Sequence, residues 1–202
     1  MRCGARQEAF RKDLGQLTWA EVFARQVQRA HLVAGWLDAL HLAPGQRLAD
    51  VGAGPGFVSL AAAQRVGPTG VVYAIDRSAE ALAFLARLQG ERGIAHIERI
   101  VADAGALPVG QLRADAALLT MVLHHADDPQ GVLRGVAGIV APGGRVVVAE
   151  FHPDGPGAVG PPPEHRLPPT VLHGWASAAG FRLVAERRQT PEHYMLLLEL
   201  LA

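Results

Sequence analysis

The chain has 202 residues, half of them hydrophobic, so we expect residues 1–202 to form one domain whose core needs neither disulfide nor metal. Basic and acidic residues number 19 each, so nucleic-acid binding, which depends on excess positive charge, is disfavoured. No apolar stretch approaches the roughly 20 residues that cross a bilayer, and no apolar signal core opens the chain, so we expect a cytoplasmic protein without a membrane span. The lone cysteine, Cys3, excludes an internal disulfide.

The first expected element is a helix at residues 21–40. Hydrophobic side chains recur there at helical spacing, namely Val22, Val27, Ala30, Val33, Trp36, Leu37 and Leu40. We expect this helix to belong to an N-terminal helical segment, residues 1–45, that packs on the core. It should lie against the first strand and the mouth of the ligand site.

The most informative stretch is residues 48–57, which read Leu-Ala-Asp-Val-Gly-Ala-Gly-Pro-Gly-Phe. An apolar strand pattern breaks there into alternate glycines and then resumes as a helical pattern. Glycines allow sharp turns and let a ligand approach main-chain N–H groups. The spacing is G-x-G-x-G, with Phe57 where the dinucleotide motif G-x-G-x-x-G has its third glycine. The stretch predicts a strand, a ligand-cradling loop and a helix, and it disfavours a nicotinamide-dependent oxidoreductase.

Beyond this loop, strand and helix patterns alternate, which is typical of parallel strands joined by helical crossovers. Strands are expected at 71–75, 97–102, 114–120 and 145–151. Two of the helices between them are expected to begin at Ser78 and at the pair Asp128–Pro129, because serine and aspartate cap helices and proline fits the first turn. Residues 142–144, Pro-Gly-Gly, should end the second of these helices.

The C-terminal part begins with a change of composition. Proline, glycine and histidine dominate residues 153–169, which predicts an irregular loop on the substrate side. A helix at 169–179 should follow, and then strands at 181–188 and 194–201, joined by a turn near 190–191 and paired antiparallel at one sheet edge. The predicted fold class is α/β: a doubly wound, mostly parallel seven-stranded sheet with an antiparallel C-terminal hairpin.

Several motifs follow one another in a recognisable order. After the glycine loop come Asp76, Asp103, Leu-His-His at 123–125 and Ala-Pro-Gly-Gly-Arg at 141–145. From about Arg47 to its C-terminus, the chain thereby resembles the class I S-adenosylmethionine (SAM)-dependent methyltransferases. The resemblance implies a Rossmann-like methyltransferase fold, SAM as cofactor and S-adenosyl-L-homocysteine as product.

The resemblance also implies a cofactor site at the carboxyl ends of the strands, where ligands of open parallel sheets bind. Asp50 would hold the methionine ammonium, Asp76 would accept from both ribose hydroxyls, and Asp103 would accept from the adenine amino group. The loop amides and the following helix N-terminus would face the methionine carboxylate. The complete set of implied cofactor residues is Asp50, Gly52, Ala53, Gly54, Gly56, Phe57, Asp76, Arg77, Asp103, Ala104, Thr120 and Met121.

The acceptor side resembles a small-molecule branch that includes quinone-biosynthesis methyltransferases, on the strength of Leu-His-His-Ala-Asp-Asp-Pro at 123–129. The fourth strand ends in Thr-Met-Val-Leu rather than an Asn-Pro-Pro-Tyr type of motif, so oxygen or carbon is expected as acceptor ahead of nitrogen. Histidine suits proton removal near neutral pH, which makes His124 and His125 candidate bases, with capping or packing as the alternative.

Three further residues are candidates for substrate contact, with an exposed loop position as the alternative for each: His152, His165 and Arg166. No close metal-ligand spacing is present, so no metal is expected. Two other functions remain open, a SAM-binding sensor without catalysis and, with less support, the nicotinamide-dependent oxidoreductase. A monomer and a homodimer are both compatible with the sequence.

Overall fold

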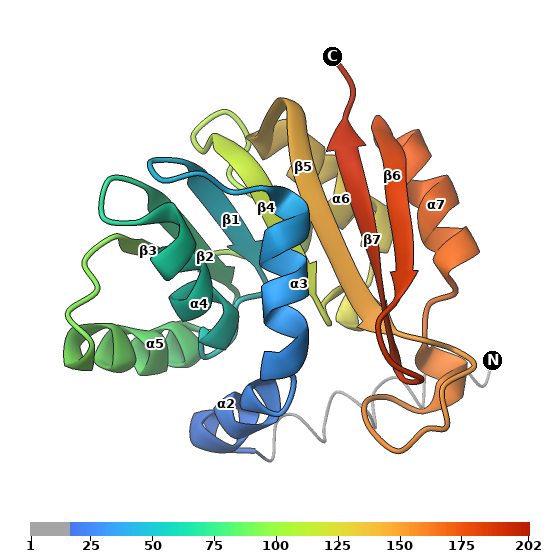
Figure 1. Cartoon of the computed structure of the whole chain (residues 1–202), viewed down its shortest axis with the longest axis horizontal. Helices are drawn as coiled ribbons and strands as arrows, with labels where there is room; N and C mark the ends of the chain where they lie inside the picture. The colour runs from blue at the N-terminus through green and yellow to red at the C-terminus, as the bar shows by residue number, and fades with distance from the viewer. Residues whose placement is uncertain (1–16) are drawn as a thin grey trace.

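The computed structural model describes residues 17–202 and contains a seven-stranded sheet in the order β3-β2-β1-β4-β5-β7-β6, with helices on both faces (Figure 1). The first four strands in the chain and β5 are parallel neighbours, and β7 runs antiparallel between β5 and β6. The predicted fold class is therefore confirmed. The strands are β1 Arg47–Val51, β2 Val71–Asp76, β3 Ile97–Val101, β4 Ala114–Thr120, β5 Val140–Phe151, β6 Phe181–Arg188 and β7 His193–Leu200.

The winding of the sheet reverses at β1, because this strand pairs with β2 on one side and with β4 on the other. Crossovers from β1 to β3 lie on one face, and the later ones lie on the other (Figure 1). In such a sheet the two strand ends at the reversal leave room for a ligand. The site is therefore expected where β1 and β4 end.

Helices cover both faces of the sheet, and the side chains of each strand alternate between two hydrophobic clusters. On β4, Leu118 belongs to the cluster beneath α3, α4 and α5, whereas Leu119 belongs to the cluster beneath α6 and α7. This double burial explains why the central strands read as almost continuous apolar runs. The helices are α2 Trp19–Val27, α3 Ala30–Leu40, α4 Phe57–Val66, α5 Ala79–Glu91, α6 Pro129–Ile139 and α7 Pro169–Ala178, with short 3₁₀ turns η1 Ala104–Ala106, η2 Leu123–His125 and η3 Pro163–His165.

Local capping signals were reliable guides to where two helices begin. Ser78 Oγ accepts from the N–H of Ala81 at the start of α5, and an Asp128 carboxylate oxygen accepts from the N–H of Gly131 at the start of α6. These bonds satisfy amide groups that a helix N-terminus otherwise leaves unpaired. Both predicted helix starts are confirmed.

The single helix expected at 21–40 is wrong, because the segment forms two helices, α2 and α3, that break at Gln28 and Arg29. The N–H of Arg29 donates to the carbonyl of Gln26, three residues back, which tightens the chain out of the α-helical ladder. Helix α2 buries none of its residues, whereas α3 buries five. The break lets α3 pack on α4, β5 and β7 while α2 reaches toward α4 and α5. Cys3 and the first 16 residues of the predicted N-terminal segment lie outside the described residues.

A second difference concerns the entry to β5, which begins at Val140 rather than at Arg145. Ala114 pairs with Val140, but Ala116 pairs with Arg145, so the intervening residues bulge out of the ladder. Gly143, with φ of 75°, supplies the left-handed backbone for this bulge. Residues 142–144 therefore follow the end of α6 as predicted, inside an irregular strand rather than a loop.

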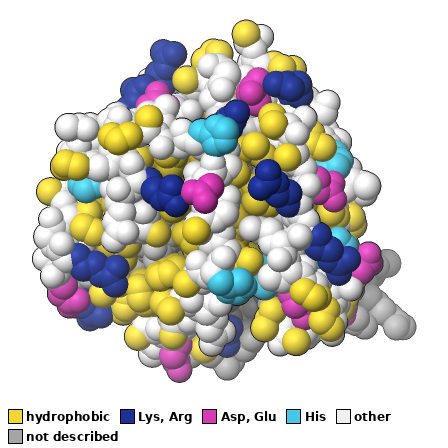
Figure 2. All heavy atoms as spheres, in the orientation of Figure 1, with side chains coloured by type: hydrophobic (Ala, Val, Ile, Leu, Met, Phe, Trp, Pro, Cys, Tyr) yellow, Lys and Arg dark blue, Asp and Glu magenta, His cyan; other side chains and the backbone are white. Residues whose placement is uncertain are grey.

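The described surface shows no concentration of one charge on the viewed face. Figure 2 shows acidic and basic side chains of both signs scattered among apolar and neutral atoms. Within residues 17–202, no helix is long and apolar enough to cross a membrane.

Candidate cofactor and acceptor site

The glycine loop, residues 52–56, turns sharply between β1 and α4. Gly52, Gly54 and Gly56 have φ of 76°, 54° and 87°, a region that favours glycine. A Cβ on Gly52 would overlap the side chain of Val122, and one on Gly56 would overlap that of Leu85. The loop is therefore pinned between the segment after β4 and helix α5, and Gly52 and Gly56 are required by packing as well as by backbone angle.

Helix α2 is attached to this loop through one side chain, that of Gln26. Its Nε2 donates to the carbonyl of Ala53 at 3.1 Å, and its Oε1 accepts from the N–H of Phe57 at 3.1 Å. The ring of Phe57 packs edge-on against Phe23, with centroids 5.7 Å apart. The sequence reasoning missed Gln26, whose side chain bonds to the backbone within the loop and just after it.

Asp50 is the penultimate residue of β1, and 1% of its surface is exposed. Its Oδ2 accepts from Ser59 Oγ at 2.5 Å, whereas its Oδ1 is buried and has no hydrogen-bond partner among the described residues. Burial, which outweighs the Ser59 bond and is reinforced by the charge of Asp76, raises the pKa of the Asp50 carboxyl to about 6. A buried acceptor without a donor is destabilising, so this oxygen suits a cationic or water donor brought by a ligand.

Asp76 and Asp103 end neighbouring strands, as predicted. Asp76 Oδ2 accepts from the N–H of Gly54 at 2.7 Å, and Asp76 Oδ1 accepts from the N–H of Ser78 at 2.9 Å. The N–H of Ala102 donates to the Asp76 carbonyl, which ties the end of β3 to the end of β2. Asp103 Oδ1 accepts from the N–H of Gly105 and so caps the η1 turn. The carboxylate of Asp76 thus contacts the glycine loop itself.

The end of β4 carries a backbone conformation that is unusual for a side chain with a Cβ. Met121 has φ of 59°, and its N–H donates to the carbonyl of Ala149 on β5 at 2.8 Å. Such positions store strain that surrounding structure must hold in place, and they gather at functional sites. The kink turns the chain so that Val122 packs on Gly52 and η2 begins beside the loop.

His124, in η2, forms a buried pair with Glu150 near the end of β5. His124 Nδ1 lies 2.6 Å from Glu150 Oε2, and both side chains are 1% exposed. Glu150 Oε1 accepts from the N–H of Leu123 at 2.8 Å and, more weakly, from that of His124 at 3.4 Å. The ring of His125 packs against that of His124, with centroids 4.1 Å apart and ring planes inclined by 40°. The carboxylate therefore fixes the orientation of the imidazole.

A family model described as a methyltransferase domain matches residues 49–148, from β1 into β5, and so spans the glycine loop, both strand-end aspartates and the histidine pair. A solved SAM-dependent methyltransferase from Aquifex aeolicus has the same fold, with a TM-score of 0.81 at 19% identity, over 92% of this chain and 100% of that one. The chain belongs to the class I SAM-dependent methyltransferases.

Curated relatives of this methyltransferase include a demethylmenaquinone methyltransferase of Renibacterium salmoninarum, 35% identical over 119 residues, which are 58% of this chain and 46% of that protein. Another is an arsenite methyltransferase of Halobacterium salinarum, 28% identical over 138 residues, which are 68% of this chain and 34% of that protein. The chain thus spans about a third to a half of the length of these relatives.

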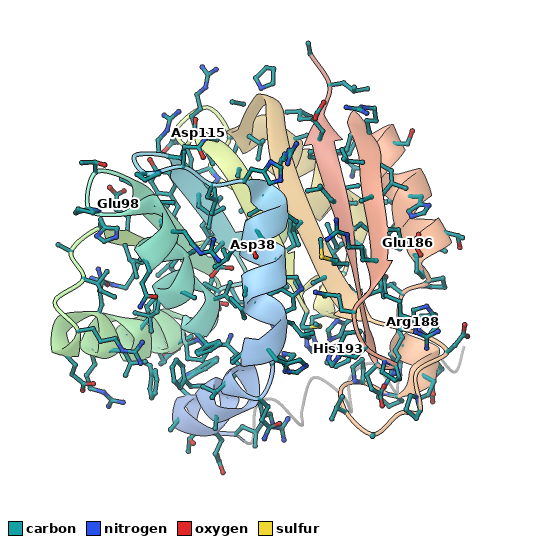
Figure 3. The ribbon with its side chains drawn as sticks, viewed as in Figure 1. Asp38, Glu98, Asp115, Glu186, Arg188 and His193 are labelled. Atoms are coloured by element: carbon teal, nitrogen blue, oxygen red, sulfur yellow. The ribbon has the colours of Figure 1, made fainter. Side chains whose placement is uncertain are left out.

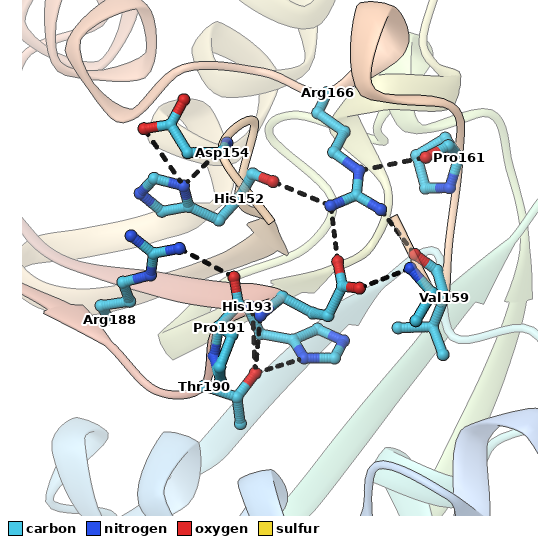
Figure 4. Close-up of polar contacts among 11 residues, drawn as sticks. His152, Asp154, Val159, Pro161, Arg166, Arg188, Thr190, Pro191 and His193 are labelled. Carbon is cyan, nitrogen blue, oxygen red and sulfur yellow. Dashed lines mark hydrogen bonds and ion pairs between the residues drawn. The ribbon is translucent and has the colours of Figure 1, made fainter. Parts of the chain in front are cut away.

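Arg166 is buried and fully engaged in hydrogen bonds, so the expectations that it binds an anionic substrate or lies exposed in a loop are both corrected. It is 4% exposed, and its guanidinium donates to the carbonyls of Pro161, His152 and Val159 and to Glu192 Oε2 at 2.6 Å (Figure 4). A proline-rich loop has carbonyls that no ladder satisfies, and a buried guanidinium with five donors serves several of them at once. Arg166 clamps residues 153–168 to the turn before β7.

The remaining substrate candidates lie in the same loop region. His152 Nδ1 accepts from the N–H of Asp154 at 3.1 Å, and its ring packs edge-on against Tyr194. His165 ends the η3 turn. These contacts position the ring of His152, and the part of either histidine in binding an acceptor stays a prediction. Within residues 17–202, no group of three or more potential ligands is arranged to hold a metal ion.

Glu150 is a site residue that the sequence reasoning missed although a signal was present. It is an acid next to the end of an otherwise apolar run, Val-Val-Val-Ala-Glu-Phe at residues 146–151. A charged residue in a strand buried on both faces needs a partner, because unpaired burial of charge is costly. The partner of Glu150 is His124.

Proposed function

We propose that this chain transfers the methyl group of SAM to an oxygen atom of a small molecule, with His124 as the base that removes the hydroxyl proton. The observation that supports this most is the buried His124–Glu150 pair, which lies where β4 and β5 end and next to the segment packed on the glycine loop. The antiparallel β7 between β5 and β6 also differs from the all-parallel dinucleotide fold, which disfavours a nicotinamide cofactor.

The residues around the loop fit SAM. Asp50 Oδ1, the buried oxygen without a donor, suits the methionine ammonium. Each oxygen of Asp76 accepts one amide hydrogen and retains a lone pair for a ribose hydroxyl. Asp103 and the N–H of Ala104 would face the adenine. SAM, when bound, supplies an electrophilic methyl group.

The protein's own contribution is alignment, exclusion of water and proton removal. With Glu150 accepting from Nδ1–H, the ring atom of His124 that takes up a proton is Nε2, and the carboxylate then stabilises the charged imidazolium. Methylation at a ring carbon of a phenol would use the same base, because the phenol hydroxyl must first lose its proton. The ring of His125, which packs against that of His124, would contact the acceptor.

Replacing Asp50 with asparagine is expected to separate stability from cofactor binding. An aspartate in the unfolded chain has a pKa of about 3.9, whereas the pKa of Asp50 in the fold is about 6. Between these two pH values the folded chain therefore binds more protons than the unfolded chain. The free energy of unfolding therefore falls as pH rises from about 4 to about 6, by about 3 kcal/mol in all. Above pH 7, Asp50→Asn should raise Tm by about 5 to 10 °C while weakening SAM binding about 10- to 100-fold.

Differential scanning calorimetry at pH 5 and pH 8, with and without SAM, measures both effects. The matched control is Asp38→Asn, which removes a carboxylate that is 62% exposed on α3 and should change little. A lower Tm for ligand-free Asp50→Asn at pH 8, or unchanged SAM affinity, contradicts the role given to this carboxylate.

The proposed function itself is tested with methyl-labelled SAM and a panel of phenols, enols, thiols and amines, alongside calorimetric titration with SAM and with NAD. We expect SAM binding, no NAD binding and label in at least one hydroxyl compound. Tight SAM binding without transfer to any compound would favour the sensor, and NAD binding without SAM binding would favour the oxidoreductase. Transfer confined to amines would overturn the choice of oxygen.

A further inference from the structure

His193, the first residue of β7, is a buried histidine with one ring nitrogen left unpartnered. The residue is 5% exposed, and its Nδ1 lies 2.9 Å from Thr190 Oγ1 (Figure 4). Nε2 is buried and has no hydrogen-bond partner within residues 17–202. Native proteins rarely leave a buried polar atom in this state, and the exceptions gather where a ligand or water completes the bond.

The position of His193 connects it to the proposed acceptor site. His193 pairs across the sheet with Phe151, and their rings lie 5.0 Å apart. The other neighbour of Phe151 is His124, whose ring meets it edge-on at 5.6 Å. The proposed base and the unpartnered nitrogen of His193 therefore belong to two ends of one row of rings.

Arg29 lies at the end of α3 that faces this row. On β7, His193 alternates onto the same face as Met195, which belongs to the same hydrophobic cluster as Leu32 and Val33 of α3. Figure 3 shows His193 at the end of β7 that lies beside the first turns of α3. Arg29 is the N-cap residue of α3, and its side chain makes no capping hydrogen bond. Burial lowers the pKa of its guanidinium, and the negative charge of Glu150 opposes that shift. Burial, and after it the positive charge of Arg29, lowers the pKa of His193 to about 4, so its ring is neutral at pH 7.

We propose that Arg29 and His193 form a subsite for a carboxylate group carried by the methyl acceptor. The position of this subsite relative to the base depends on the function proposed above. A guanidinium presents two parallel N–H donors that match a carboxylate, and a neutral imidazole adds a third from Nε2. The rings of Phe151 and His124 beside this subsite offer aromatic surface to the body of the acceptor, so the acceptor class that we propose is a hydroxylated aromatic acid.

Access to the subsite has a structural consequence. Nε2 of His193 is buried, so a carboxylate that binds it needs a movement of the surrounding chain, and the proposal places that movement at the junction between α2 and α3. This junction is the break at Gln28 and Arg29, where the helical ladder is already interrupted. The carboxylate would then stand between the guanidinium of Arg29 and the neutral ring of His193.

The test is equilibrium binding of 2-, 3- and 4-hydroxybenzoate, each paired with its uncharged amide, to the full chain saturated with S-adenosyl-L-homocysteine. We expect at least one acid to bind about 10- to 100-fold more tightly than its amide. Arg29→Met and His193→Phe should each remove most of this preference, and Arg29→Lys should restore part of it. The matched control, Arg25→Met, removes the same charge from the exposed end of α2 and should keep the preference.

The outcomes separate this proposal from the function on which it depends. If the chain methylates acids and amides equally well and Arg29→Met changes neither, the subsite is wrong and the methyl transfer stands. If the acids bind with the expected preference and no compound is methylated, the subsite stands and the base assignment fails. Absence of acid binding, or an equal loss in Arg25→Met, overturns the subsite. Thermal melting of each variant identifies any that fails to fold, and Arg29→Lys then decides.

Discussion

Replacing Glu150 with glutamine is expected to lower kcat by about 100- to 1,000-fold while SAM affinity stays within about twofold. The glutamine oxygen can still accept from the N–H of Leu123, so η2 should keep its place. Its NH₂ group, however, would donate to His124 Nδ1, and a neutral imidazole that accepts at Nδ1 carries its hydrogen on Nε2. The variant therefore holds His124 in the tautomer whose Nε2 already carries a hydrogen and cannot take a proton from the acceptor.

Initial-rate kinetics with a phenolic acceptor found in the labelled screen measures this effect, together with the pH dependence of kcat. His124→Ala should lose a similar factor and recover part of it with added imidazole, whereas an orienting role alone predicts no rescue. Glu199→Gln, which changes the same group in an exposed ion pair on β7, is the matched control. Equal losses in kcat and SAM affinity for Glu150→Gln would mean that the pair holds the fold and not a proton.

Replacing Asp76 with alanine is expected to weaken SAM binding by at least about 100-fold. The change would remove the two proposed charge-assisted bonds to ribose hydroxyls, each worth about 1.5 to 3 kcal/mol. It also frees the N–H of Gly54, so the glycine loop loses the carboxylate that holds its middle residue. The two effects act on the same ligand and should add.

Isothermal titration with SAM and with S-adenosyl-L-homocysteine measures the loss, and thermal melting checks that the fold survives. Asp154→Ala, which removes an aspartate from the loop after β5 with 82% side-chain exposure, is the control. Asp103→Ala should fall between the two, because its carboxylate also caps η1. SAM affinity that is unchanged in Asp76→Ala would remove the cofactor site from the end of β2.

Much of the fold could be predicted because the local signals were not in conflict. Central strands are buried on both faces, so their apolar runs stand out, and Ser78 and Asp128 cap the helices that follow them. The break at Gln28 escaped prediction since apolar residues keep helical spacing across it. What separates α2 from α3 is tertiary: one reaches the glycine loop, and the other packs on the sheet.

The candidate site was predicted where its residues end strands and was missed where a partner lies far along the chain. The strand-end aspartates and His124 follow from position alone. Gln26 contacts a carbonyl 27 residues away, and the proposed pairing of Arg29 with His193 depends on the packing of α3 against β7. Arg166 was misjudged because proline-rich segments are usually solvated, and no local pattern shows that a loop has folded around its own arginine.

The segments on the two sides of the candidate site differ in how firmly they are held to the fold. On the C-terminal side, the buried side chain of Arg166 holds the loop at residues 153–168. Helix α2, in contrast, buries no residue and is hydrogen-bonded to the glycine loop through Gln26. We therefore expect ligands to enter and leave the candidate site on the α2 side, because release of this helix would break few other contacts. Substitutions on α2 are therefore expected to change the rate of ligand exchange more than the stability of the fold, which makes this helix the first place to alter in an engineered variant.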